Sequence, residues 1–233
     1  MKRVFLRSVG DPERNPDGSL YTDPTLLREA SVAITRHATN GVAGRSMGDP
    51  IFEEVTEGRQ KNAGYSACGD LCHYDLECLG LRDESILNRT DDAGQVPWKV
   101  GVNVSRLVYA SKVLVWASKA PLDRPNRGDI VWVQSPDHVC VLTYWEDEID
   151  EVTGVLTGQA YVCEYGGWTA ERGYFGCENQ HALGGKRGSI RFGARVLMGW
   201  LPIRALKLTQ SACVPDDFDG GIADPSPDPV THA

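Results

Sequence analysis

The sequence predicts an α+β fold in which one cysteine-bearing helix packs against an antiparallel β-sheet. The helix signal runs from Gly64 to Gly80, where Cys68, Cys72 and Leu76 recur at intervals of four residues and so share one helix face. The sheet signal comes from runs of β-branched and aromatic residues that turn residues separate. These runs span residues 130–133, 138–144 and 160–165, and two closing strands are expected within 188–201.

Composition divides the chain into three parts. Residues 1–60 are expected to form an N-terminal arm and a helix, residues 61–205 the catalytic domain, and residues 206–233 an acidic tail rich in proline and aspartate. The formal net charge is −8, and residues 214–233 contain five aspartates and no lysine or arginine. Such a segment buries too little apolar surface to offset the entropy of ordering it, so the tail is expected to be disordered.

Several classes of partner are not expected. No apolar run approaches the ~20 residues of a membrane span, and the charged residues 1–7 lack the apolar core of a signal peptide. No cluster of lysine and arginine indicates nucleic-acid binding. We therefore expect a monomeric cytoplasmic product, released by lysis or by a dedicated secretion machine if it acts elsewhere. Most of its seven cysteines are expected to be core thiols, because disulfides are rare in reducing compartments.

Cys68 is the candidate nucleophile. Ser66 is a suitable N-cap and Asp70 lies in the expected first turn, so Cys68 occupies a position where the helix dipole favours negative charge. A thiol in such a position has its pKa lowered from about 8.5 into a range of roughly 3.5–7.5. Cys72 is a rival one turn later, whereas Cys78 lies at the end of the helix where the dipole disfavours a thiolate.

His138 and Glu164 are the candidate partners of the thiol. His138 opens the β-rich run that follows the turn at residues 134–137, and an imidazole transfers protons near neutral pH. Glu164 is a carboxylate inside an apolar run, which requires a specific interaction if it is buried. A cysteine at a helix start, a histidine at a strand start and a polar residue on the next strand indicate nucleophilic catalysis. Asp137 and Asn179 stay open as alternatives to Glu164.

This order of residues resembles the NlpC/P60 and CHAP amidase–peptidases. The resemblance is carried by Cys68, Gly128-Asp129-Ile130-Val131, His138-Val139-Cys140-Val141, Glu164 and the closing run 195–202, and it covers roughly residues 61 to 205. It implies a papain-like fold, with the nucleophile helix N-terminal to an antiparallel sheet. It also implies a cysteine amidase or peptidase that needs no cofactor and no metal.

The resemblance further implies that the substrate is an amide bond in a peptidoglycan stem peptide or cross-bridge, as for a lysin or an antibacterial effector. Cys68 is expected to attack the carbonyl carbon while His138 carries the proton and Glu164 orients the imidazole. The backbone N–H of Cys68 is expected to contribute to the oxyanion hole. The residues expected around the oxyanion and on the walls of the substrate groove are Tyr65, Trp98 and Trp168.

Three alternatives compete with this hypothesis. The protein is a protein-directed cysteine protease, or it is a non-catalytic binding or virion-associated module on the same scaffold. The third alternative is a metal site. The ligands available on the helix, Cys72, His73 and Cys78, scatter around its axis, whereas His138 and Cys140 share one face of a strand. One pair is therefore geometrically possible, whereas a structural zinc needs four ligands.

Overall fold

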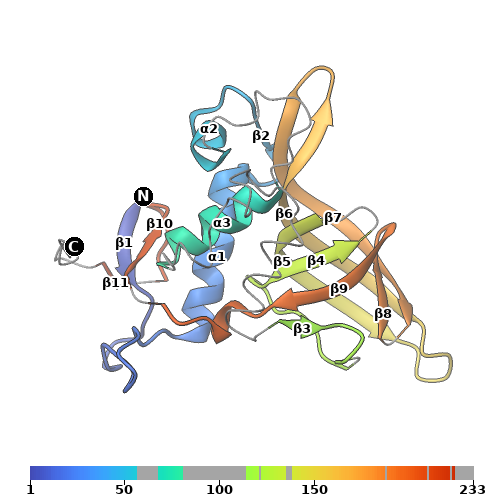
Figure 1. Ribbon diagram of the computed structural model, residues 1–233, viewed down its shortest axis with the longest axis horizontal. Helices are drawn as coiled ribbons and strands as arrows, with labels where there is room; N and C mark the ends of the chain where they lie inside the picture. The colour runs from blue at the N-terminus through green and yellow to red at the C-terminus, as the bar shows by residue number, and fades with distance from the viewer. Residues whose placement is uncertain are drawn as a thin grey trace, which may run out of the picture.

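The computed structural model describes residues 1–56, 68–80, 114–120, 122–134, 138–186, 188–208, 210–220 and 222–223 (Figure 1). This part of the chain is mostly β-structure. Its three α-helices are α1 (Pro24–Thr39), α2 (Pro50–Thr56) and α3 (Cys68–Cys78). The helices lie beside a strongly curved sheet that contributes most of the described strands.

Six antiparallel strands form a closed barrel. β4 pairs with β5 and β9, β5 pairs with β6, and β6 pairs with β7. The ring closes because β8 pairs with both β7 and β9. The barrel strands are β4 (Ile130–Gln134), β5 (His138–Ile149), β6 (Leu156–Thr169), β7 (Gly173–Lys186), β8 (Ser189–Phe192) and β9 (Arg195–Leu201). Two short strands extend the sheet, β2 (Arg45–Ser46) on β7 and β3 (Val115–Trp116) on β9.

The closed barrel corrects the fold class that the sequence predicted. A papain-like α+β fold, with the nucleophile helix N-terminal to an antiparallel sheet, is wrong for this chain. The described residues instead form a mostly β structure whose sheet closes on itself. Apolar periodicity marks individual strands, but closure depends on how the first and last strands meet. Here the first barrel strand, β4, pairs with the last, β9, and the short strand β8 joins β9 to β7.

β4 and the first half of β5 are buried on both faces. One core cluster draws residues from all six barrel strands and fills the barrel, with Val131, Val133 and Cys140 among its members. The alternate residues Ile130 and Trp132 belong to a second core cluster that lies between the barrel and the helices. Burial on both faces explains why residues 130–133 form a continuous apolar run rather than an alternating one.

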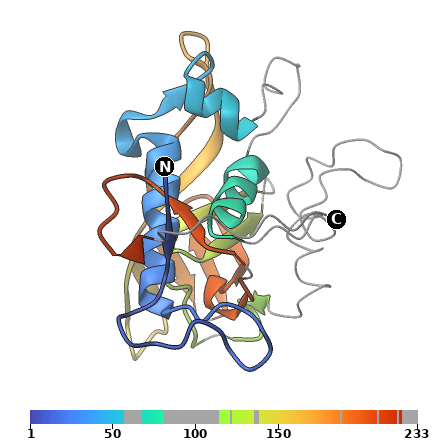
Figure 2. The ribbon, with the colours of Figure 1, turned by 90° about the vertical axis from the view of Figure 1, so that its left-hand side faces the viewer.

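Helices α1 and α3 lie side by side against one flank of the barrel (Figure 2). α1 begins at the N-cap Asp23, whose side chain accepts hydrogen bonds from the backbone N–H groups of Thr25 and Leu26. The helix expected within residues 1–60 is thereby confirmed. The hydroxyl of Ser31 on α1 donates to Asp75 on α3 at 2.8 Å, and both residues are fully buried. This contact fixes the two helices to each other.

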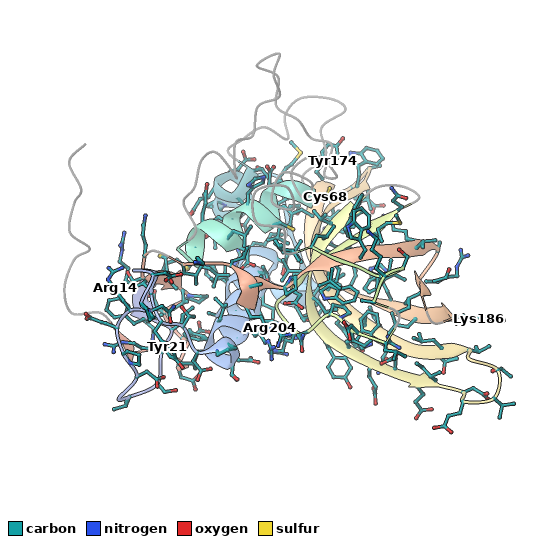
Figure 3. All side chains as sticks on the ribbon, turned by 60° about the horizontal axis from the view of Figure 1, so that its bottom comes forward. Arg14, Tyr21, Cys68, Tyr174, Lys186 and Arg204 are labelled. Carbon is teal, nitrogen blue, oxygen red and sulfur yellow. The ribbon has the colours of Figure 1, made fainter. Side chains whose placement is uncertain are left out.

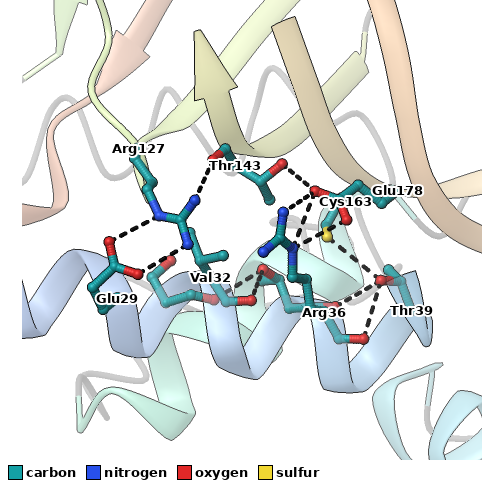
Figure 4. A network of polar contacts seen from close by, with 10 residues as sticks. Glu29, Val32, Arg36, Thr39, Arg127, Thr143, Cys163 and Glu178 are labelled. Carbon is teal, nitrogen blue, oxygen red and sulfur yellow. Dashed lines mark hydrogen bonds and ion pairs between the residues drawn. The ribbon is translucent and has the colours of Figure 1, made fainter. Parts of the chain in front are cut away.

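Charged side chains join α1 to the barrel (Figure 4). Arg36 of α1 donates to Glu178 of β7 at 2.7 Å, and the hydroxyl of Thr143 of β5 donates to the same carboxylate at 2.5 Å. Arg127, just before β4, donates to Glu29 of α1 and to the backbone carbonyl of Thr143, each at 2.9 Å. These contacts fix the angle of α1 across β5 and β7, and hence the position of α3 next to α1.

The two chain ends form a small second sheet. Its strands are β1 (Lys2–Phe5), β10 (Ala212–Val214) and β11 (Ile222–Ala223), with β1 in the middle. Phe218, between β10 and β11, is only 7% exposed and belongs to the core cluster beneath the helices. Residues 210–220 are therefore built into the fold, in contrast to the disordered tail that their composition suggested. Residues 224–233 lie outside the described part, and the division into three regions stays a prediction.

Candidate active site

Cys68 is the first residue of α3, which agrees with its predicted place in the first turn of a helix, and the predicted N-cap Ser66 lies outside the described residues. The helix dipole therefore favours a negative charge on its thiol. Asp70 lies in the same first turn. Figure 3 shows Cys68 where α3 meets the strands of the barrel. Its side chain is covered, because the residue is only 1% exposed.

His138 connects Cys68 to Glu164. It is the first residue of β5 and pairs with Val133 of β4. The imidazole makes side-chain hydrogen bonds with both Cys68 and Glu164. Its Nε2 lies 2.5 Å from Oε2 of Glu164, so Nδ1 is the ring nitrogen left for the thiol. The three side chains therefore form one continuous chain of hydrogen bonds from α3 through β5 to β6.

The surroundings of His138 favour its protonated form. Burial by itself lowers the pKa of the imidazole, because a buried charge loses its hydration. The hydrogen bonds with Cys68 and Glu164 outweigh this effect and raise the pKa of His138 to about 9. A protonated imidazole beside Cys68 favours ionisation of that thiol, and the thiolate is the reactive state of a nucleophilic cysteine.

Glu164 is held as a carboxylate by a ring of donors. Oε2 faces His138, while Oε1 accepts a hydrogen bond from Nδ2 of Asn179 at 2.7 Å and lies 3.3 Å from Nε2 of His181. Nη1 of Arg195 is 4.0 Å from Oε2. Burial raises the pKa of this carboxyl group, but the hydrogen bonds from His138, His181 and Asn179 lower it well below its usual range.

The sequence does not indicate His181 or Arg195 as site residues, and it offers Asn179 only as an alternative to Glu164. In the structure Asn179 is hydrogen-bonded to Glu164 itself. Both Asn179 and His181 belong to β7, where they are two residues apart and so point to the same face. The glycines of β7 hide its strand character, because glycine is unfavourable in strands and typical of loops.

The structure brings together Cys68, His138 and Glu164, whose catalytic roles stay a prediction. Trp168 lies near the end of β6, beyond a β-bulge between Tyr165 and Gly167, and is 62% exposed. No hydrogen bond or ring contact joins Trp168 to the three site residues in the described part of the structure. The remaining predicted groove and oxyanion residues, Tyr65 and Trp98, lie outside the described residues.

The other cysteines of this region are poorer nucleophiles. Burial raises the pKa of the Cys72 thiol well above its ordinary value, and the nearby charge of Cys68 adds to the effect. Burial also raises the pKa of Cys78 to about 12, and that of Cys140 well above the ordinary range. Cys68 shares a hydrogen bond with His138, which sets it apart from these three thiols.

One group of side chains has the composition of a metal site. Possible ligand atoms of His138, Cys140 and Glu164 all lie within 4.8 Å of one another. His138 and Cys140 are two residues apart on β5, and Glu164 comes from the neighbouring strand β6. The predicted strand pair therefore has a third potential ligand.

Comparisons with protein-family models, with curated proteins and with solved structures gave no match. Among the residues that the structure describes, no helix combines the length and the apolar character needed to cross a bilayer. Any statement about function therefore depends on the geometry of the site and on the resemblance of its motifs. The geometry offers a cysteine at a helix start, a protonated histidine and a fixed carboxylate, in that order.

Proposed function

We propose that the protein is a cysteine hydrolase that cleaves an amide bond. The observation that carries this proposal is the chain of hydrogen bonds from Cys68 through His138 to Glu164. It links a nucleophile, a proton-transfer group and an orienting carboxylate, and its surroundings favour a protonated His138 and an ionised Glu164. Glu164 is the third member in this proposal, with Asn179 supporting it from behind.

The reaction follows from these positions. The Cys68 thiolate attacks the carbonyl carbon, and the negative charge moves to the carbonyl oxygen. The Cys68 N–H lies at the described N-terminal end of α3, where the helix dipole favours negative charge, so it is suited to receive that oxyanion. His138 then donates its proton to the leaving amine, the C–N bond breaks and a thioester remains. Water, deprotonated by His138, attacks the thioester and releases the carboxylate and Cys68.

The proposed substrate is a peptidoglycan stem peptide or cross-bridge, cleaved by a lysin or by a delivered antibacterial effector. This part rests on the resemblance to NlpC/P60 and CHAP enzymes in the residues around Cys68, His138 and Glu164. It does not rest on the fold, because the barrel differs from the fold which that resemblance implied. A protein-directed protease has the same chemistry with a different substrate.

A non-catalytic binding module is the second candidate, and the burial of Cys68 favours it. A nucleophile that is 1% exposed reaches a substrate only after its surroundings move. The hydrogen-bonded pair of His138 and Glu164 favours the hydrolase hypothesis, because a non-catalytic binding module does not need a buried imidazolium. Burying a charge is costly unless it is paired, and such groups concentrate at functional sites.

Fragment analysis tests the proposal. Purified protein is incubated with peptidoglycan and, separately, with a peptide library, and the released products are identified by mass. The proposal expects products with new amine and carboxyl ends, lost in Cys68→Ala and retained in Cys72→Ala, the matched thiol one turn along α3. Cleavage of the library alone would replace peptidoglycan by protein as the substrate. Absence of cleavage in both, or full activity of Cys68→Ala, would contradict the hydrolase.

A further inference from the structure

We propose that His138, Cys140 and Glu164 form a Zn²⁺ site whose occupation stops the hydrolase. The inhibitory part of this inference rests on the proposed function, whereas the metal site itself does not. The three residues supply an imidazole nitrogen, a thiolate and a carboxylate, all of which are common zinc ligands. They come from two adjacent strands of the barrel, β5 and β6, whose backbones are paired with each other.

The separations between the three possible ligand atoms are close to those of a zinc site. The three possible ligand atoms lie within 4.8 Å of one another. Zinc–ligand bonds of about 2.0–2.3 Å in a tetrahedron place neighbouring ligand atoms roughly 3.3–3.8 Å apart. The contact of 2.5 Å between His138 Nε2 and Glu164 Oε2 therefore opens by about 1 Å when the ion enters, and the longer separations shorten. Such shifts lie within the reach of side-chain rotation. Water completes the fourth position.

Glu164 already has the supporting contacts that a metal-binding carboxylate needs. Asn179 and His181 hold its Oε1, which leaves Oε2 facing His138. Hydrogen bonds of this kind orient ligands around metals and strengthen binding. Arg195 opposes a cation, because its guanidinium is 4.0 Å from Oε2, but this side chain is 28% exposed and has a path to solvent. We therefore expect Arg195→Gln to tighten zinc binding.

The proton balance explains the inhibition. Zinc on Nε2 of His138 takes the place of the proton on that nitrogen, and zinc on Sγ of Cys140 takes the place of the thiol proton, so both protons pass to solvent. The imidazole keeps one proton, on Nδ1, which faces Cys68. Donating that proton to a leaving amine would leave an imidazolate. His138 therefore ceases to be a useful general acid, and cleavage of the C–N bond stops.

Cobalt binding tests the site without any need for activity. Co²⁺ is titrated into the full-length Cys68→Ala variant, in which Cys68 cannot serve as a ligand. We expect one Co²⁺ per chain with a near-ultraviolet thiolate-to-cobalt band, which Zn²⁺ displaces. Adding Cys140→Ser should abolish the band, whereas adding Cys163→Ser, which changes another buried thiol, should leave it. No band, or a band that survives Cys140→Ser, would overturn the site.

Two further measurements separate the possible failures. Circular dichroism establishes that Cys140→Ser folds; if it does not, Glu164→Gln takes its place and should weaken Co²⁺ binding at least tenfold. In the active protein, Zn²⁺ should abolish hydrolysis and EDTA should restore it. For Cys140→Ser, with activity expressed relative to its own metal-free rate, the Zn²⁺ concentration needed for the same inhibition should be at least tenfold higher. Equal inhibition of both proteins would place zinc on Cys68 and overturn the proposal. A cobalt band in a protein without hydrolytic activity would uphold the site and refute the proposed function.

Discussion

At the scale of single residues, the fixed point of the site is Glu164. Its two oxygens are approached by His138, Asn179 and His181, and Arg195 lies slightly farther away. A carboxylate held in this way orients an imidazole and stabilises its positive charge, but it does not itself exchange protons with a substrate. Substitution of Glu164 is therefore expected to lower activity less than substitution of His138.

Substitution of the two residues should reveal that difference. His138→Ala removes the proton-transfer group and should lower kcat/KM by roughly 10²–10⁴. Glu164→Gln keeps the shape but removes the charge, and should cost about tenfold to a hundredfold. The measurement is kcat/KM for both variants on the same substrate. Equal activity of Glu164→Gln and the unmodified protein would remove Glu164 from the site.

Asp75 provides a second test at this scale. It is fully buried, and burial raises its pKa well above the usual value in spite of the hydrogen bond from Ser31. The folded state thus keeps a proton that the unfolded chain loses above pH ~4, so the stabilising effect is complete below that pH and declines as pH rises. Asparagine does not titrate, so Asp75→Asn removes this pH-dependent loss of stability.

Urea unfolding at several pH values measures the effect. The stability of Asp75→Asn relative to the unmodified protein should increase from pH 4 to pH 8, by roughly 1 kcal/mol per pH unit at most. The matched variant Ser31→Ala should destabilise the protein, because it removes the donor at 2.8 Å and leaves Asp75 without that bond. A difference between Asp75→Asn and the unmodified protein that does not change with pH would contradict this account.

At the scale of elements, the sequence predicts the helix start at Cys68 and the strand at His138 because both have strong local signals. A capped, four-spaced helix and a β-branched run need no knowledge of the rest of the chain. The sequence does not predict a strand at β7, because the glycines of this segment are typical of loops. One of those glycines has a structural reason, because the ring of Tyr165 on β6 lies directly over Gly176.

Gly176→Ala should be strongly destabilising. An added Cβ would lie 2.0 Å from the Tyr165 ring. That ring is held in place by stacking on Phe52 and by a 2.6 Å hydrogen bond from its hydroxyl to the carbonyl of Ala38. We expect a loss of about 3 kcal/mol from overpacking. Gly184→Ala on the same strand is the control, because nothing lies within 4 Å of its added Cβ. Thermal melts that show equal changes in both variants would argue against the β6–β7 register.

At the scale of the whole molecule, barrel closure is the feature that the sequence does not reveal. The runs 130–133, 138–144 and 160–165 lie within observed strands, and the two closing strands within 188–201 correspond to β8 and β9. Closure depends on the long-range pairing of β4 with β9, which leaves no periodic mark in the sequence. The ordering of residues 210–220 is likewise a long-range effect, because their few apolar side chains find a partner only in the folded core.

Phe218 tests this integration of the chain end. Its side chain is buried in the core cluster beneath the helices, so Phe218→Ala should cost roughly 3 kcal/mol and lower Tm. Val152→Ala, at a 95% exposed position, should change stability by less than about 0.5 kcal/mol. The experiment is a pair of thermal melts on full-length protein. Unchanged stability of Phe218→Ala would mean that this segment does not dock.

The ionisation of Cys68 decides the central claim, and competitive alkylation measures it. Substoichiometric iodoacetamide at pH ~6.5, with EDTA present, reacts with thiolates and hardly with ordinary thiols. Cys68 is 1% exposed and Cys72 is 6% exposed, so access does not favour Cys68 over its neighbour. The account predicts that peptide mapping finds Cys68 labelled before Cys72, and that His138→Ala slows labelling of Cys68 but not of the half-buried Cys213. Preferential labelling of Cys72, or uniform slow labelling of all seven cysteines, would contradict it.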